Sequence, residues 1–263
     1  MKHNLKVVII LLVMFLLAQY IGLYISNSYV SRELPFGIEK PEFRQETSFA
    51  SIFFAVLIAT AFAIAMIKFN AARLWKFWFF MSVWFALIIS FSVFFNQLIA
   101  LITALIITIF KVFKHNIIIH NLSELFIYGG LAAIFAQSLS IFSVSILLIL
   151  ISVYDMIAVW QTKHMIKLAK FQTKLNLFAG FLLPYKEKKQ VKTAILGGGD
   201  IGFPLLFASV IFKSIGFKAL IIPLTTSLLL FGLFWYGDKN KFYPAMPFLS
   251  VGCFLGYFLA IAL

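Results

Sequence analysis

Charged residues, acidic ones in particular, and cysteine are scarce in this sequence. Charged side chains make up 12% of the 263 residues, whereas a soluble domain carries about 25%. Hydrophobic residues reach 63% and the mean hydropathy is +1.02, so the composition excludes an ordinary soluble domain and a disordered chain. The single cysteine, Cys253, excludes a disulfide framework and any cysteine-rich metal site.

The charge that is present is mostly basic. Lysine and arginine number 22 against 9 acidic residues, which gives a formal net charge of +13. Such an excess can indicate a nucleic-acid partner, but in a chain this apolar the basic residues instead mark the loops that stay in the cytoplasm. We therefore expect the lipid bilayer, and no nucleic acid, as a partner of this protein.

Long hydrophobic runs predict an all-α, polytopic membrane protein with nine transmembrane helices. A bilayer core about 30 Å thick needs about 20 apolar residues per helix. The candidate stretches cover residues 5–25, 48–67, 77–95, 97–113, 122–139, 141–160, 193–212, 217–236 and 244–263. The continuous runs 77–110 and 122–160 would be about 50 and 58 Å long as single helices, so each is expected to turn back on itself, near 96–97 and near 137–140.

The basic residues alternate between the connections, as a multi-pass topology requires. One set of alternate connections, which includes Lys111, holds 17 lysines and arginines, and the other set holds 5. Basic residues accumulate in cytoplasmic loops, so we expect the amino terminus in the cytoplasm and the carboxyl terminus outside. An odd number of spans is consistent with this arrangement.

No soluble domain is predicted. The chain divides into helices one to six in residues 1–160, a cytoplasmic basic amphipathic loop in 161–192, and helices seven to nine in 193–263. Four lysines of the loop recur at helical spacing among apolar residues: Lys163, Lys167, Lys170 and Lys174. This pattern predicts a helix held at the interface by anionic lipid, or a gate over the membrane interior. Neither metal nor cofactor is expected, because the histidines fall in connections without ligand partners and are interpreted as solvated; they are His3, His115, His120 and His164.

Two acidic residues lie deep in predicted spans, where ionisable residues mark function by default. Asp155 precedes Lys163 by eight residues, and Asp200 follows Lys192 by eight. Both carboxyls are thus expected about 12 Å below the basic boundary, on consecutive and hence neighbouring helices. Glu124, two or three residues inside its span, is interpreted as an interfacial carboxylate favoured by the helix dipole.

A pair of carboxylates at one depth suits acid–base chemistry. Two such groups cannot both ionise cheaply, so the pair holds one proton. The ionised member can then activate a water molecule, and the protonated member can protonate a leaving group. Two alternatives remain open on depth alone: a hydrogen-bonded pair that only joins two helices, and a proton relay in a transporter or cation channel.

The residues around Asp200 favour a loosened helix. The glycines Gly197–Gly199 precede it, and Gly202 and Pro204 follow it. Glycine removes side-chain bulk and proline removes an N–H donor, so polar backbone groups are exposed in a segment that must line protein or water. Peptide hydrolysis inside a bilayer requires such a gap, and an extended substrate could pair with a loosened edge.

Three motifs lie in order along the chain: Tyr154-Asp155, the Gly-x-Gly-Asp of Gly197–Asp200, and Pro244-Ala245-Met246. They resemble the signatures of the presenilin and signal peptide peptidase family of intramembrane aspartyl proteases. That family has nine spans, with its aspartates on the sixth and seventh and a Pro-Ala-Leu motif opening the ninth. All three motifs fall in the matching predicted spans here, with Met246 in place of leucine.

The resemblance implies an aspartic endopeptidase in which Asp155 and Asp200 are the catalytic pair. It further implies active-site support or substrate docking for Tyr154, Gly197, Gly199, Pro244, Ala245 and Met246. The implied substrates are transmembrane segments of single-span proteins, cleaved without a cofactor and without a required accessory subunit. The orientation derived from the charges agrees with presenilin, and the chain is similar to an archaeal homologue in the cell membrane of a prokaryote.

Two competing functions are kept. A proton-coupled transporter or cation channel would use the same aspartate pair, although the sequence lacks the internal repeat that many transporters have. A prepilin-type peptidase shares the Gly-x-Gly-Asp motif, but it acts at the cytoplasmic face and has fewer spans.

Overall fold

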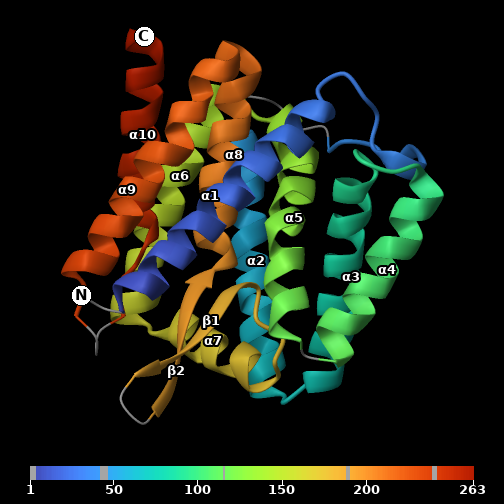
Figure 1. The fold of residues 1–263 in the computed structure, drawn as a ribbon, viewed down its shortest axis with the longest axis vertical. Coiled ribbons are helices and arrows are strands. Elements are labelled where there is room, and N and C mark those ends of the chain that lie inside the picture. Colours follow the sequence, from blue (N-terminus) through green and yellow to red (C-terminus); the bar gives the residue numbers. More distant parts are fainter. Residues whose placement is uncertain (1–3, 42–46, 115, 188–189, 239–241) are drawn as a thin grey trace.

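The fold is a bundle of apolar helices with a short β-hairpin at one end (Figure 1). A computed structural model describes residues 4–41, 47–114, 116–187, 190–238 and 242–263. In these residues a helix occupies each of the nine predicted ranges. These helices are α1 (Leu5–Ser28), α2 (Ser48–Lys68), α3 (Ala72–Phe91), α4 (Gln97–Phe113), α5 (Ile117–Phe135), α6 (Ile141–Met156), α8 (Gly198–Ile215), α9 (Ile221–Tyr236) and α10 (Met246–Ala262).

Six segments of the described chain are long and apolar enough to cross a membrane. One of them is the 39-residue stretch Gly198–Tyr236, which would span about 58 Å as one straight helix. The 3₁₀ turn η4 (Gly216–Leu220) divides it into α8 and α9, with Gly216 at a φ of 61°. The helices α4 and α10 are apolar but only 17 residues long. A mostly helical, multi-pass membrane protein is thereby confirmed, and nine crossings stay a prediction.

Polar residues end the helices where the long apolar runs were expected to turn. Asn96 precedes α4 and accepts a hydrogen bond from the Ile99 N–H at 2.9 Å. The second run ends in the 3₁₀ turn η2 (Ala136–Ser138), after which the Ser140 hydroxyl accepts from the Ser143 N–H at 3.1 Å. Such N-terminal caps satisfy backbone donors that the helix leaves free. Both runs are thus interrupted where the turns were predicted. The helices α3 and α4 pack against each other as a hairpin, whereas α6 packs mainly against α2, α8 and α10.

The prediction of an all-α chain missed a β-hairpin. Strand β1 (Gly180–Glu187) pairs antiparallel with β2 (Gln190–Gly197), so that the helix predicted from residue 193 begins only at Gly198. Along β2, Ala194 and Leu196 are buried whereas Thr193 and Ile195 are exposed. This alternation is typical of a strand, but it lies between a lysine-rich segment and an apolar run, where it resembles the start of a membrane helix.

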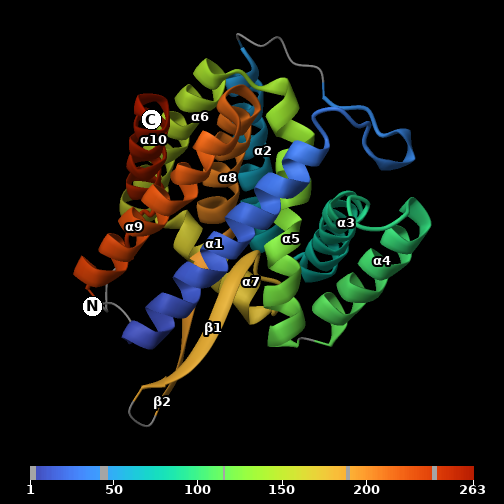
Figure 2. The same ribbon diagram turned by 45° about the horizontal axis from the view of Figure 1, so that its top comes forward.

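The remainder of the segment predicted as a basic loop contains helix α7 (His164–Lys174). Its lysines Lys167, Lys170 and Lys174 are exposed, as is Lys163 just before it, whereas Ile166 and Leu168 are partly buried. The amphipathic pattern therefore corresponds to a short helix that packs against α2. In Figures 1 and 2, α7, the hairpin and the start of α1 lie toward one end of the molecule, and the end of α10 lies at the other.

Helix α8 is central to the bundle. It packs against α1, α5, α6, α9 and α10, and its residues from Pro204 to Ile211 are all buried. Close packing of apolar side chains from so many neighbours supplies the main stabilisation of such a helix. The amino-terminal turn of α8, which carries Asp200, is thus positioned by most of the molecule.

Candidate active site

Asp155 lies at the end of α6, just before the π-helical turn η3 (Ile157–Gln161). Turns of this kind are frequent at functional sites. The Asp155 oxygen Oδ2 accepts a hydrogen bond from the backbone N–H of Met246 at 3.1 Å. One member of the predicted pair is therefore in direct contact with the Pro-Ala-Met motif.

The contact with Met246 follows from the position of that residue at the start of α10. The first N–H groups of a helix have no acceptor within it, so the Met246 N–H is free to bind a side chain. The side chain of Met246 is 3% exposed, and Pro244 is also buried. Burial of both side chains fixes the backbone between them, and with it the donor that faces Asp155.

Asp200 lies in the first turn of α8, whose N-cap is Gly197, the last residue of β2. The helix dipole favours a carboxylate at this end. A Cβ at Gly197 would lie 3.2 Å from the Asp200 Oδ2, so the glycine lets the carboxyl lie close to the backbone. A Cβ at Gly199 would meet only the Phe203 ring, at 3.7 Å. Crowding around Asp200 therefore accounts for Gly197 and not for Gly199.

The structure brings the three motif-bearing helices together, because α6, α8 and α10 all pack against one another. Tyr154, in contrast, is directed toward α7 and α2. Its hydroxyl lies 2.9 Å from His164 Nε2, and its ring meets that of Phe53 edge-on. His164 was predicted to be solvated, but it is partly buried, and burial lowers the pKa of its imidazole.

The base of the hairpin holds the start of α8. The Gly198 N–H donates a hydrogen bond to the Ala179 carbonyl at 3.0 Å. Next to this contact, Gly180 has a φ of +134°, and a Cβ there would collide with the Leu196 carbonyl oxygen. Only glycine adopts this backbone conformation without strain, so Gly180 is required where β1 meets the residues before Asp200.

Replacing Gly180 by alanine is expected to displace the hairpin base and lower proteolytic activity by about tenfold or more, since errors of about 1 Å in an active site cost up to about 10²-fold. Gly232→Ala in α9 is the matched control, because a Cβ there meets nothing within 4 Å. Cleavage rates per folded molecule would be compared. Equal rates for the two variants would contradict the role given to Gly180.

A side chain from α1 also reaches the backbone beside Asp200. The Gln19 amide Nε2 donates a hydrogen bond to the Ile201 carbonyl at 2.9 Å, and Gln19 is 1% exposed. Pro204 has no N–H to offer the Asp200 carbonyl one turn before it, and Gln19 donates to the next carbonyl along this turn, that of Ile201. The sequence-based list of site residues did not include Gln19.

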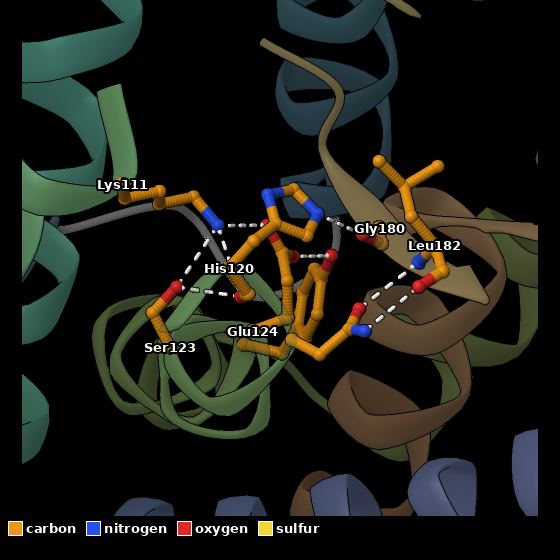
Figure 3. Close-up of polar contacts among 8 residues, drawn as sticks. Lys111, His120, Ser123, Glu124, Gly180 and Leu182 are labelled. Atoms are coloured by element: carbon orange, nitrogen blue, oxygen red, sulfur yellow. Dashed lines mark hydrogen bonds and ion pairs between the residues drawn. The ribbon is translucent and has the colours of Figure 1, made fainter. Parts of the chain in front are cut away.

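A buried polar cluster on α4 and α5 was also not predicted from the sequence (Figure 3). Lys111 and Glu124 form an ion pair with a 2.6 Å separation, and each side chain is 1–2% exposed. Glu124 is thus buried about two turns inside α5 and not in its first turn, and Lys111 lies within α4 and not in a loop. His120, predicted to be solvated, is 6% exposed and donates from Nε2 to the Gly180 carbonyl at 2.8 Å. Four polar residues within one turn of an apolar helix, 120–124, were the available signal.

In the described part of the chain, no three His, Cys, Asp and Glu side chains are grouped so that they could hold a metal ion. The groups that the three motifs contribute to acid–base chemistry are the two carboxyls, and the Met246 N–H lies beside that of Asp155.

Residues 8–263 match the family described as signal-peptide peptidase, presenilin aspartyl protease. The chain belongs to this family. Two solved structures, both of a presenilin family intramembrane aspartate protease in different crystal forms, are similar in fold. The C222 form has a TM-score of 0.67 and 21% identity over 97% of this chain and 98% of the other. The P2 form has a TM-score of 0.68 and 21% identity over 96% of both chains. Among curated proteins, no sequence matches significantly.

Membership of this presenilin-type family confirms the class predicted from the three motifs: an aspartic endopeptidase of the intramembrane type, embedded in the bilayer as a multi-pass protein. The match extends over nearly the whole chain, so it includes the helices that carry all three motifs.

Proposed function

We propose that this presenilin-family protease hydrolyses peptide bonds within transmembrane segments of single-span proteins, using a water molecule activated between Asp155 and Asp200. The observation that carries this proposal is the contact of Asp155 with the Met246 N–H. It joins two of the three motifs in space, and α8, which bears Asp200, packs against both helices. Gly197, Gly199, Pro244 and Ala245 support the site through the backbone in this proposal and Tyr154 flanks it, and no accessory subunit is part of the proposal.

The proposed reaction needs only the two carboxyl groups and water. The ionised carboxylate takes a proton from the water molecule while the water oxygen attacks the peptide carbonyl carbon. The protonated carboxyl stabilises the oxyanion that develops on the carbonyl oxygen. Collapse of the intermediate breaks the C–N bond, and the amine leaves with a proton from the pair. One water is consumed, and a carboxylic acid and an amine are formed.

The assay that tests this function uses purified protein in lipid vesicles with a panel of membrane-helix substrates. We expect release of two peptides from at least one substrate. An inhibitor that mimics the tetrahedral intermediate of aspartyl proteases should block the release. If the same vesicles showed cation flux that depends on the aspartates but no cleavage, the transporter or channel alternative would be supported and the proposal contradicted.

The substrate must present an extended backbone, and strand β2 offers an edge for it. This strand runs directly into Gly197, and Val191 and Ile195 on it are 70% and 38% exposed. An extended segment that pairs with an exposed strand gains backbone hydrogen bonds. The substrate helix therefore has to unwind close to the aspartate pair before it is cleaved.

Substrates with weaker helices should be cleaved faster. Each alanine-to-glycine change near the scissile bond lowers helix stability by about 1 kcal/mol, which corresponds to about a fivefold gain in kcat/KM if unwinding precedes cleavage. The control places the same change at the far end of the substrate helix. If both positions gave the same rates, unwinding at the site would not limit the reaction.

We also propose that the end of the molecule with the hairpin faces the cytoplasm. Exposed Lys186 and Lys192 on the hairpin and the lysines of α7 lie at this end, as basic residues in cytoplasmic loops do. The only cysteine is buried, so single-cysteine labelling is direct. A Lys170→Cys variant should react with an impermeant reagent only from the cytoplasmic side, and Phe36→Cys only from the outside. The assignment to a prokaryotic cell membrane stays a prediction.

A further inference from the structure

The buried ion pair between α4 and α5 has no part in the chemistry described above. Lys111 Nζ lies 2.6 Å from Glu124 Oε1, 2.9 Å from Ser123 Oγ and 3.3 Å from the His120 carbonyl oxygen (Figure 3). All three donors of the ammonium group thus have an acceptor. Replacing a buried ion pair by apolar residues is often neutral or stabilising, so stability alone does not account for it.

The second oxygen of Glu124 leads from the ion pair toward α8. Its Oε2 accepts a hydrogen bond from the Tyr128 hydroxyl, one turn further along α5. The side chain of Tyr128 is 4% exposed. Both carboxylate oxygens of Glu124 are therefore engaged, one by the lysine on α4 and one by the tyrosine, and the tyrosine hydroxyl is fixed in place.

Tyr128 lies against the turn of α8 that carries Asp200. A Cβ at Gly198 would lie 2.9 Å from the Tyr128 hydroxyl oxygen, and one at Gly202 would lie 3.5 Å from the ring carbon Cδ1. Residues four apart lie on one face of a helix, so the ring occupies the space left by these two glycines. Asp200 lies between them in the chain. Gly198, between the two glycines of the motif, is thus required because a larger side chain there would collide with Tyr128.

The same part of α5 also holds the hairpin. Asn121 donates from Nδ2 to the Leu182 carbonyl at 2.7 Å and accepts from the Leu182 N–H at 3.0 Å, as a neighbouring strand would. His120 binds the Gly180 carbonyl next to them. Because the Ala179 carbonyl accepts from the Gly198 N–H, α5 reaches the start of α8 by a second route, through β1.

We propose that Glu124 and Tyr128 are positioning residues for Asp200. The ion pair with Lys111 fixes Glu124, Glu124 fixes the Tyr128 hydroxyl, and the Tyr128 ring sets the first turn of α8, and hence the distance of Asp200 from Asp155. The inference rests on the proposed function, since Glu124 and Tyr128 would control the geometry of the aspartate pair.

Two conservative variants test this role. Tyr128→Phe keeps the ring and removes the hydroxyl, and Glu124→Gln keeps the shape and removes the charge. Turnover per active site, counted by titration with the transition-state-mimicking inhibitor, should fall about tenfold to 10²-fold, with KM within about twofold. The pH profile of kcat should also move, because the sharing of the proton depends on the distance between the aspartates. The kcat of the double variant should be no lower than that of the slower single variant, because both changes act through the same contact between Glu124 and Tyr128.

Matched controls are available on the surface. Tyr24, which is 59% exposed and stacked on Phe94, gives Tyr24→Phe, and exposed Glu39 gives Glu39→Gln. Both should leave kcat and the pH profile unchanged. If Tyr128→Phe and Glu124→Gln lower only the yield or the thermal stability, with wild-type turnover per titrated site and an unmoved pH profile, the role is merely structural and the proposal is overturned.

A readout that needs no activity separates this inference from the proposed function. Hydrogen–deuterium exchange in residues 196–202 should be faster in Tyr128→Phe and Glu124→Gln than in wild type, and unchanged in α9. Unchanged exchange in 196–202 overturns the positioning role even if the wild-type protein cleaves its substrates. Faster exchange in a protein that cleaves no substrate supports the positioning contact and rejects the proposed function.

Discussion

Replacing Asp155 or Asp200 by asparagine is expected to lower the rate of peptide release by about 10⁴-fold, the upper range for loss of a general acid or base. Asparagine has the shape of aspartate but cannot act as a general base or a general acid. In Asp155→Asn the side-chain oxygen can still accept the hydrogen bond from the Met246 N–H, which Asp155 accepts at 3.1 Å, so the fold should be kept. Release of labelled peptide from a membrane-helix substrate measures the effect.

Glu39→Gln is the control for loss of an acidic group, because Glu39 is exposed in the connection between α1 and α2. Its cleavage rate should equal that of the wild type. In the wild type, kcat should show a bell-shaped dependence on pH, because the pair works with one proton. A rate within tenfold of wild type for Asp155→Asn or Asp200→Asn, in well-folded protein, would remove that residue from the proposed pair.

Replacing Lys111 by methionine is expected to lower the free energy of unfolding by about 3–5 kcal/mol, the cost of leaving one partner of a buried ion pair uncompensated. Methionine fills a similar volume, so the loss comes from the charge and the hydrogen bonds and not from a cavity. The Glu124 carboxylate would then face an apolar neighbour and the Ser123 hydroxyl would lose its donor, whereas the His120 carbonyl would keep the hydrogen bond from Ser123. Thermal or denaturant unfolding in detergent measures the effect.

Lys114→Met, three residues further along the chain, is the matched control. Lys114 is exposed, with its ammonium group over the Phe110 ring at 4.7 Å, so its replacement should change the unfolding free energy by less than about 1 kcal/mol. The double variant Lys111→Met/Glu124→Gln should recover more than half of the unfolding free energy that Lys111→Met loses, because no charge is then buried without a partner. Equal effects of Lys111→Met and Lys114→Met would show that the buried pair carries no such cost.

The helical part of the fold was predictable because its signals are local. Apolar length alone located the nine helical ranges, and Asn96 and Ser140 ended the long runs where they turn. The hairpin was not predictable in the same way. Its strands pair with each other and with Asn121 on α5, 61 positions before Leu182. Such a contact between distant segments cannot be inferred from either segment alone.

The depth of Asp155 and Asp200 in the membrane stays a prediction. Both were singled out by their distance to the nearest lysines, but the residues from Lys192 to Gly197 form a strand, which rises more per residue than the helix assumed in that estimate. Glu124 and Lys111 were misplaced, because each was assigned to an interface or a loop from its position near the end of a span. Their mutual contact, across the turn between α4 and α5, allows both to be buried. Pairing between two helices is a property that neither helix shows alone.

Sequence alone was sufficient to predict the membrane class, the helical architecture and the aspartyl protease family. Hydrophobic length, the charge of each loop and the three short motifs can all be recognised from residues that are close together in the chain. Contacts between distant segments decided the rest: the Met246 N–H on Asp155, Gln19 on the Ile201 carbonyl, and Tyr128 against Gly198. These contacts join residues that are 70 to 182 positions apart in the chain. The reason is physical, since a hydrogen bond or a steric fit depends on where folding brings two groups and not on the residues beside them.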